Sequence, residues 1–118
     1  MIRLAHMVAA LFLATPLASC KPASVADDSV RTEFVAACMA RVEYRSMETI
    51  RRTAYCECGY DRTMSGLSDN EKPYAQFYLL SQVGIDVRKR KLISKPDMQA
   101  MIKASKAIGR AVAQCRRQ

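Results

Sequence analysis

The chain has 118 residues, enough for one domain and too few for two. It carries 19 Lys and Arg against 11 Asp and Glu, and its single histidine, His6, lies close to the N-terminus. The four glycines are scattered along the chain, so the composition excludes a glycine-rich phosphate loop, and it places no imidazole site in the body of the chain.

Residues 1–19 have the features of a secretory signal. Arg3 supplies a positive charge, residues 5–13 form an apolar run, and Thr15-Pro16 breaks it. The run is too short for a transmembrane helix. We expect this segment to be removed on export, which leaves 18 Lys and Arg against 11 Asp and Glu, a formal charge of +7, because Arg3 is its only charged side chain.

The segment ends in Leu17-Ala18-Ser19-Cys20. A branched apolar residue followed by two small residues and a cysteine resembles the lipobox of bacterial lipoproteins, in which the cysteine is diacylated and becomes the new N-terminus. The resemblance implies that Cys20 anchors the protein to a cell-envelope membrane, facing the periplasm. In the enterobacterial sorting rule that accompanies it, an aspartate at position 21 would retain the protein at the inner membrane, so Lys21 indicates the outer membrane. The alternative is cleavage after Ala26, which would remove Cys20 and release a soluble protein.

Residues 20–28 are polar and without periodicity, which predicts a linker to the lipid anchor. The helical pattern begins at Ser29, and an apolar residue recurs every four positions at Val30, Phe34, Cys38 and Val42. This spacing places Cys38 on the buried face of a first helix.

A second helix is expected from about Ser46 to Gly66. It has two apolar stripes, one formed by Met47, Ile50, Ala54 and Cys58 and the other by Cys56, Tyr60 and Met64. A helix with two apolar faces usually lies between two neighbours. On its polar surface, Glu48 and Arg52 have the spacing of an i,i+4 ion pair.

Four cysteines remain after Cys20 is set aside, and an exported protein normally oxidises them. Cys56 and Cys58 would point about 200° apart on a helix, so they cannot bond to each other without strain. Two pairings remain: Cys38–Cys56 with Cys58–Cys115, or Cys38–Cys58 with Cys56–Cys115. The sequence does not decide between them, although we favour the first.

A third helix is predicted between two local signals. Ser68 and Glu71 have the spacing of a capping box, and Gly84 is placed to end a helix that reaches Val83. The helix contains the densest group of aromatic residues, Tyr74, Phe77 and Tyr78, which we interpret as core.

Arg88-Lys89-Arg90-Lys91 is a run of four cations that cannot be buried. We interpret it as a solvated segment that keeps the domain soluble. Its functional alternative is contact with an anionic surface such as lipid phosphates.

The last helix is predicted to begin at Pro96, a residue suited to the first helical position. An apolar or small residue then recurs at three- and four-residue steps as far as Cys115: Met98, Met101, Ile102, Ser105, Ile108, Gly109, Val112 and Cys115. This stripe predicts that Cys115 lies on the buried face.

Because no segment alternates with the two-residue period of a half-buried strand, the prediction is an all-α fold, a small bundle of about four helices over residues 29–118 braced by disulfides. The function expected is that of a non-enzymatic, membrane-anchored binding or accessory module that contacts another envelope protein or the cell wall, without cofactor, metal or nucleic acid. The alternative is a periplasmic thiol-redox or soft-metal-handling protein that uses Cys56 and Cys58.

Overall fold

The computed structural model describes residues 24–117, with side chains from Ser29 onward. The predicted signal peptide, Cys20 and the first part of the linker lie outside this range. The described residues form α1 (Ser24–Met39), the 3₁₀ helix η1 (Val42–Tyr44), α2 (Thr49–Ser65), α3 (Lys72–Gln82) and α4 (Met98–Cys115), with no strand among them. The predicted all-α, four-helix fold is confirmed. No helix in this part of the chain combines the length and apolarity needed to cross a bilayer.

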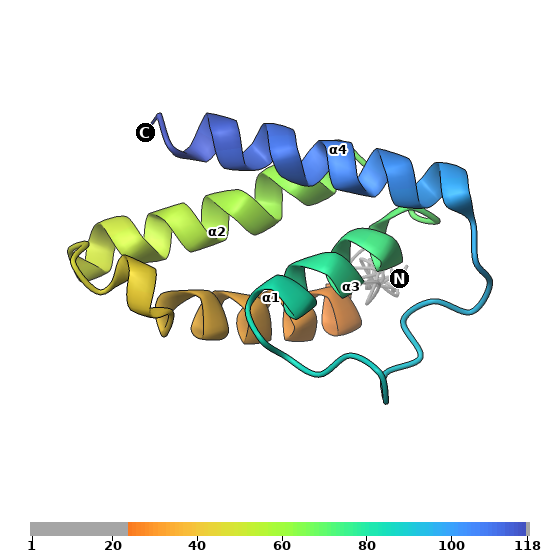
Figure 1. The fold of residues 1–118 in the computed structure, drawn as a ribbon, viewed down its shortest axis with the longest axis horizontal. Coiled ribbons are helices and arrows are strands. Elements are labelled where there is room, and N and C mark those ends of the chain that lie inside the picture. Colours follow the sequence, from red (N-terminus) through yellow and green to blue (C-terminus); the bar gives the residue numbers. More distant parts are fainter. Residues whose placement is uncertain (1–23, 118) are drawn as a thin grey trace, which may run out of the picture.

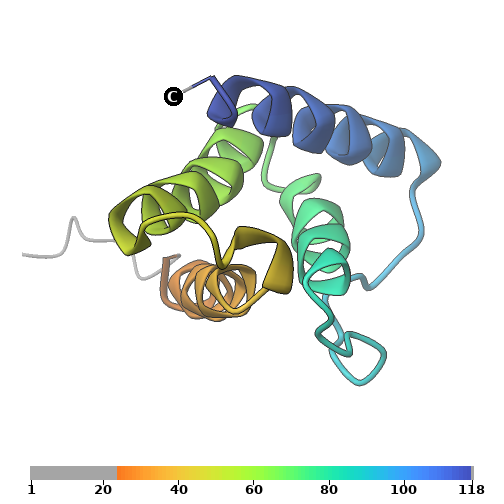
Figure 2. The same cartoon turned by 60° about the vertical axis from the view of Figure 1, so that its left-hand side comes forward.

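Helix α2 is the centre of the bundle. It packs against α1 on one side and α4 on another, and α3 packs mainly against α4. Helices α2 and α4 run antiparallel (Figure 1), and Cys115, the last residue of α4, lies beside the middle of α2. The view in Figure 2 shows η1 turning the chain from α1 into α2, while the long connection between α3 and α4 forms the other end of the molecule.

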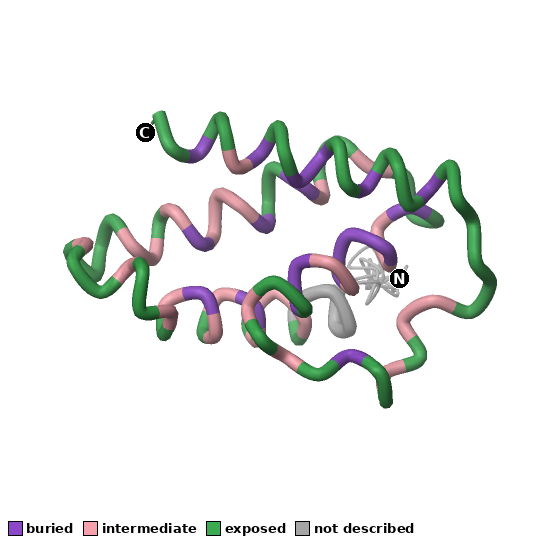
Figure 3. Tube along the Cα trace, in the orientation of Figure 1, coloured by how far each residue is buried: buried purple, intermediate pink, exposed green. Residues whose placement is uncertain are grey.

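The core has two parts. The larger joins α1, α2 and α3 to the last turns of α4, and the smaller joins the start of α3 to the start of α4. Buried positions recur about once per turn along α4 (Figure 3). The larger cluster consists of Phe34, Cys38, Cys56, Tyr60, Leu79, Leu80, Val87 and Ile108, and the smaller of Tyr74, Ala75, Ala100 and Ala104.

Helix α1 differs from the prediction at both ends. It begins at Ser24, so the last five residues of the expected linker are helical. Residue types favoured at an N-cap are also favoured in a first helical turn. The sequence therefore did not distinguish the end of a linker from the first turn of the helix. At the other end, Arg41 is extended and the chain turns into η1. Val42 is consequently 70% exposed and is not part of the α1 stripe.

The prediction for α2 was right for one stripe and partly right for the other, whose Cys58 faces α4 as expected. Cys56 and Tyr60 are buried, as expected. The helix begins at Thr49 rather than near Ser46, and Ile50 in its first turn is 81% exposed. The first turn therefore lies at the end of the bundle, where none of the helices that the structure describes covers the Ile50 side chain.

Helix α3 has the predicted end signals. The Ser68 N–H donates to Glu71 Oε1 at 2.9 Å, which is one half of a capping box. Gly84 has a φ of 84°, a conformation that favours glycine. The aromatic group is core, as interpreted: Tyr74 is buried, and Phe77 and Tyr78 are half-buried with their rings in an edge-to-face arrangement.

Helix α4 is capped by Asp97, whose Oδ1 accepts from the N–H groups of Gln99 and Ala100 at 3.0 and 3.2 Å. The helix therefore begins at Met98, after the cap, and not at Pro96. Its buried face was predicted correctly at Ile108 and Cys115 but not in the first turns, where Met98 is 73% exposed. The buried positions there and further along the helix are instead alanines, at 100, 104, 107 and 111.

Candidate functional site

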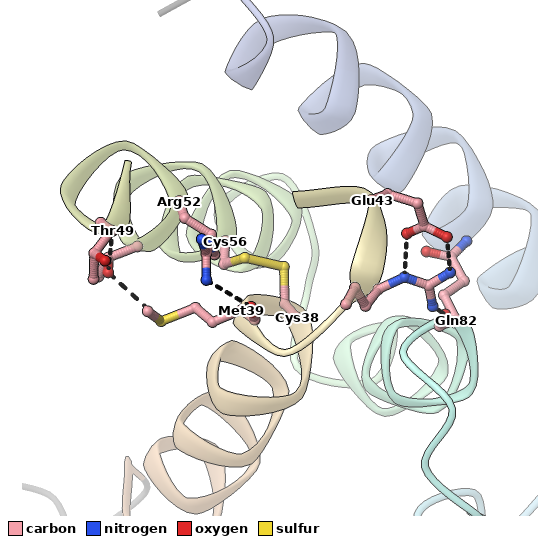
Figure 4. The surroundings of a disulfide bond; sticks show 9 residues. Cys38, Met39, Glu43, Thr49, Arg52, Cys56 and Gln82 are labelled. Atoms are coloured by element: carbon pink, nitrogen blue, oxygen red, sulfur yellow. Dashed lines mark hydrogen bonds and ion pairs between the residues drawn. A yellow bond between two sulfur atoms is a disulfide. The ribbon is translucent and has the colours of Figure 1, made fainter. Parts of the chain in front are cut away.

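Two disulfides join α2 to its neighbours. Cys38 of α1 bonds to Cys56, with the Cα atoms 5.9 Å apart, and Cys58 bonds to Cys115 of α4, with the Cα atoms 5.8 Å apart. Figure 4 shows the first bond running from the end of α1 to the middle of α2. The prediction of two disulfides is confirmed, and the pairing is the favoured one of the two that the sequence left open.

The Cys56-Glu57-Cys58 segment is thus not a dithiol in this structure. Its two sulfur atoms bond to different helices, so neither is a thiolate that could attack a disulfide or bind a soft metal. Chemistry of either kind would require that both disulfides be reduced. Among the side chains that the structure describes, no three from His, Cys, Asp or Glu gather closely enough to hold a metal ion.

A cleft of about 310 Å³ lies between the helices, beside both disulfides. Its walls come from all four α-helices and are largely apolar. They include buried residues of the larger core cluster and three of the bonded cysteines. The apolar lining residues include Phe34, Cys38, Cys56, Leu79, Val112 and Cys115, and the polar ones include Arg41, Glu43, Thr63 and Gln82.

An ion pair closes one side of the cleft. Arg41, just before η1, donates through Nε and Nη2 to the Glu43 carboxylate at 2.7 and 2.9 Å. Its Nη1 donates to the backbone carbonyl of Gln82 at the end of α3. The hydrogen bond from Arg41 lowers the pKa of Glu43. Arg41 thereby connects the turn after α1 to α3, and each of its three nitrogens already donates a hydrogen bond. Figure 4 labels its two partners, Glu43 and Gln82.

Two tyrosines form another wall of the cleft. The rings of Tyr44 in η1 and Tyr55 in α2 are tilted against each other with centroids 5.2 Å apart. Burial raises the pKa of the Tyr44 phenol, and its hydrogen bond with Tyr55 adds to the shift. The Tyr44 hydroxyl therefore stays neutral at physiological pH and is engaged with Tyr55.

A second hollow of about 340 Å³ lies on the other side of these tyrosines. It shares Tyr44, Tyr55 and Cys115 with the cleft, so the two spaces adjoin. Its other walls include Arg51 at the start of α2 and Arg116 just after α4, both exposed, and no acidic residue. This hollow is the electropositive end of the site.

The basic run lies in the connection between α3 and α4. Arg88 pairs with Asp86 at 3.0 Å, and Arg90 pairs with Glu33 on α1. Lys89 and Lys91 are exposed. The run is a solvated segment, as interpreted, except that Arg90 is half-buried and attaches the segment to α1.

Apart from Phe34, Val112 and the bonded cysteines, the residues around the cleft were not selected by sequence reasoning. Arg41, Tyr44, Tyr55 and Arg116 form no motif, and they are brought together only because the disulfides fix three helices around one space. The sequence did contain one signal for the cleft. Gly59 lies inside a helix, where glycine costs about 1 kcal/mol of stability relative to alanine, so a glycine at this position indicates a local role.

The fold and the site define a disulfide-braced helical domain with an apolar cleft. The chain matches no protein-family model, no curated protein and no solved structure. Functional reasoning therefore rests on the residues of this chain.

Proposed function

We propose that the protein is a non-enzymatic, lipid-anchored accessory module of the bacterial cell envelope. Cys20 would carry the lipid, and the helical domain would face the periplasm and bind another envelope protein or the cell wall. The observation that supports this proposal best is the pairing of four of the five cysteines in two disulfides. Disulfides persist in exported proteins, and Cys20 is the cysteine left over, at the position that the lipobox resemblance assigns to the lipid.

The short chain between Cys20 and α1 would hold the domain close to the membrane. Ser24, the first residue of α1, is four residues beyond Cys20, a span of at most about 14 Å. Glu33, which binds Arg90, is nine residues further along the helix, or about 14 Å at 1.5 Å per residue. The basic segment is thus attached to the helix that the anchor would fix.

Of the four cations in that segment, Lys89 and Lys91 are the ones we assign to an anionic surface. Arg88 and Arg90 are neutralised by Asp86 and Glu33. Each lysine close to an anionic bilayer contributes up to about 1 kcal/mol. The two lysines would therefore orient an anchored domain, and they are too few to hold it on the membrane without the lipid.

Fractionation of cells that express the Cys20→Ala variant tests the anchor. The wild-type protein should sediment with membranes and resist a high-salt wash, whereas the variant should be released. A Lys89→Ala, Lys91→Ala double variant serves as the control and should stay membrane-bound, because it retains the lipid. A Cys20→Ala protein that remains in salt-washed membranes would show that lipidation is not the anchor.

Thiol labelling of the unreduced protein separates this proposal from the thiol or metal alternative. We expect no labelling of Cys56 or Cys58 and a mass four hydrogens below that of the reduced chain, because both residues are in disulfides. Free thiols at these two positions would favour the alternative. Crosslinking of the lipidated protein in intact cells, followed by co-purification, would then identify the envelope partner. Recovery of the protein without a crosslinked protein or cell-wall fragment would count against an accessory role.

A further inference from the structure

We propose that the cleft and the adjoining arginine hollow form one binding site for an anionic amphiphile of the fatty-acid class. The hydrocarbon chain would occupy the cleft, and the carboxylate would lie beside Arg51 and Arg116 in the hollow. This inference goes beyond the accessory role proposed above and does not depend on the lipid anchor.

The cleft suits a short hydrocarbon chain. Its volume of about 310 Å³ is at the lower end of the range found for small-molecule sites. At the roughly 30 Å³ that one water molecule occupies in the liquid, it has room for about ten non-hydrogen atoms. Most of its wall area is apolar, although Arg41, Glu43 and Gln82 also line it. The disulfides hold the walls in place, so little conformational entropy is lost when a ligand binds.

Gly59 indicates that the space is kept open. It lies in the middle of α2, one turn from Tyr55 and one turn from Thr63, and all three line the cleft. A Cβ atom built on Gly59 meets no other heavy atom within 4 Å, so close packing does not require glycine there. Glycine in a helix interior is unfavourable, and here its visible effect is to leave the cleft free of a side chain.

The charges around the site place the polar head in the hollow. Arg41 borders the cleft, but Glu43 and the Gln82 carbonyl occupy its donors. Among the side chains that the structure describes, residues 29–117, Arg51 and Arg116 line the hollow without an acidic neighbour in its wall, and neither forms an ion pair. A carboxylate is therefore favoured in the hollow, and a cationic or zwitterionic head is not.

The tyrosine pair lies where a bound chain would pass from one space to the other. Tyr44 and Tyr55 line both spaces, and Tyr44 belongs to the short η1 segment rather than to a long helix. Their rings offer an apolar surface to the hydrocarbon, and the hydroxyl proton that their mutual hydrogen bond does not use can be donated to a carboxylate. The site thus has a mainly apolar body and two arginines at its other end, as an anionic amphiphile requires.

Titration calorimetry with decanoate tests the proposal. The protein is the exported chain carrying Cys20→Ala, purified without reductant, so that no acyl group of its own competes. Decanol, which has the same chain length without the charge, is the matched ligand. We expect decanoate to bind at one site per chain and more tightly than decanol. Failure of decanoate to bind, or binding no tighter than that of decanol, would overturn the proposal.

Two sets of variants locate the binding. Gly59→Leu fills the cleft and should weaken decanoate binding by about tenfold or more. The paired Arg51→Gln and Arg116→Gln changes should weaken decanoate binding by about fivefold but leave decanol unchanged. Unaltered decanoate binding in either variant would contradict the assignment of the corresponding space.

A conservative pair of variants keeps the test valid if Gly59→Leu does not fold. Gly59→Ala and Gly109→Ala each replace a glycine in a helix interior, and neither added Cβ meets an atom within 4 Å. Both should raise the thermal stability of the domain. Only Gly59→Ala should reduce decanoate affinity, because Gly109 does not line the cleft. Equal affinities of the two variants would refute the role given to Gly59.

Discussion

Cys56 and Cys58, separated by one residue on α2, bond to helices on different sides of it. The first connects α2 to the end of α1, and the second connects it to the end of α4. One short segment of α2 thus fixes the relative position of three helices. The cleft lies beside both bonds, so its shape depends on them.

Loss of either disulfide should destabilise the domain, and the Cys58–Cys115 bond should matter more. The two bonds close loops with sequence separations of 18 and 57 residues. Chain-entropy arguments give about 3 kcal/mol for the shorter loop and about 4 kcal/mol for the longer one. Urea unfolding of two double variants measures both losses of stability. One variant carries Cys38→Ala and Cys56→Ala, and the other carries Cys58→Ala and Cys115→Ala. A larger loss from the first variant would contradict this ranking.

Arg52→Ala should cost about 1 to 3 kcal/mol of unfolding free energy. Arg52 Nη2 donates to the backbone carbonyls of Arg45 and Met47 at 3.0 and 2.9 Å, and Nη1 reaches the Met39 carbonyl at 3.4 Å (Figure 4). These bonds hold the turn between α1 and α2. The sequence had instead predicted that Arg52 would pair with Glu48. The neighbouring Arg51→Ala, at an exposed position, is the control and should change the urea midpoint little. Equal midpoint shifts in the two variants would remove the role given to Arg52.

Glu71 should make the stability of the domain depend on pH in the acidic range. Its carboxylate accepts from the Ser68 backbone and pairs with Lys103 of α4 at 3.3 Å, and the bond to Ser68 is the main cause of its lowered pKa. Because the folded-state pKa lies below the unfolded value of about 4.5, the stabilisation is complete above pH 4.5. It is lost as the pH falls through the folded-state pKa.

The Glu71→Gln variant measures this effect. Thermal unfolding should show the variant less stable than the wild type near neutral pH, with the difference shrinking as the pH falls below 4.5. Glu48→Gln, at an exposed position where the side chain makes no cap bond, is the control and should show no comparable trend. A Glu71→Gln difference that stays constant with pH would contradict the assignment.

Glu33→Gln should loosen the segment between α3 and α4. Glu33 binds Arg90, and the hydrogen bond from that guanidinium lowers the pKa of Glu33. Trypsin cleavage at residues 88–91 should become faster by up to about fivefold, the upper limit for a partly exposed ion pair. Asp61→Asn, which removes the Arg31–Asp61 pair between α1 and α2, is the control and should leave this cleavage unchanged. Equal rates in Glu33→Gln and the wild type would show that Arg90 does not hold the segment.

The sequence predicted the fold well because its strongest signals are local. The glycine after α3, the Ser68–Glu71 spacing and the recurrence of apolar residues each act within a few positions. The error on α4 has a physical cause. Large apolar residues usually mark a core face, but α4 approaches its neighbours through alanines, since small side chains allow close packing. Met98 and Ile102 then remain on the outside.

The candidate site could not be predicted from the sequence, because its parts have no common local pattern. Tyr44 belongs to a short turn, Arg51 to the start of α2 and Arg116 to the end of the chain. Their proximity depends on the Cys58–Cys115 bond, and the sequence left its pairing open. The basic run was visible, but its division into paired arginines and exposed lysines depends on Glu33 and Asp86, which only the fold places beside it.

Disulfide mapping tests most directly the claim that α2 is joined to α1 through Cys56 and to α4 through Cys58. Digestion of the unreduced protein with a protease that cleaves after Glu57 separates the two cysteines, and mass spectrometry then identifies the linked peptides. The account predicts one linked pair containing Cys38 and Cys56 and a second containing Cys58 and Cys115. A peptide that joins Cys38 to Cys58, or one with either cysteine as a free thiol, would contradict it.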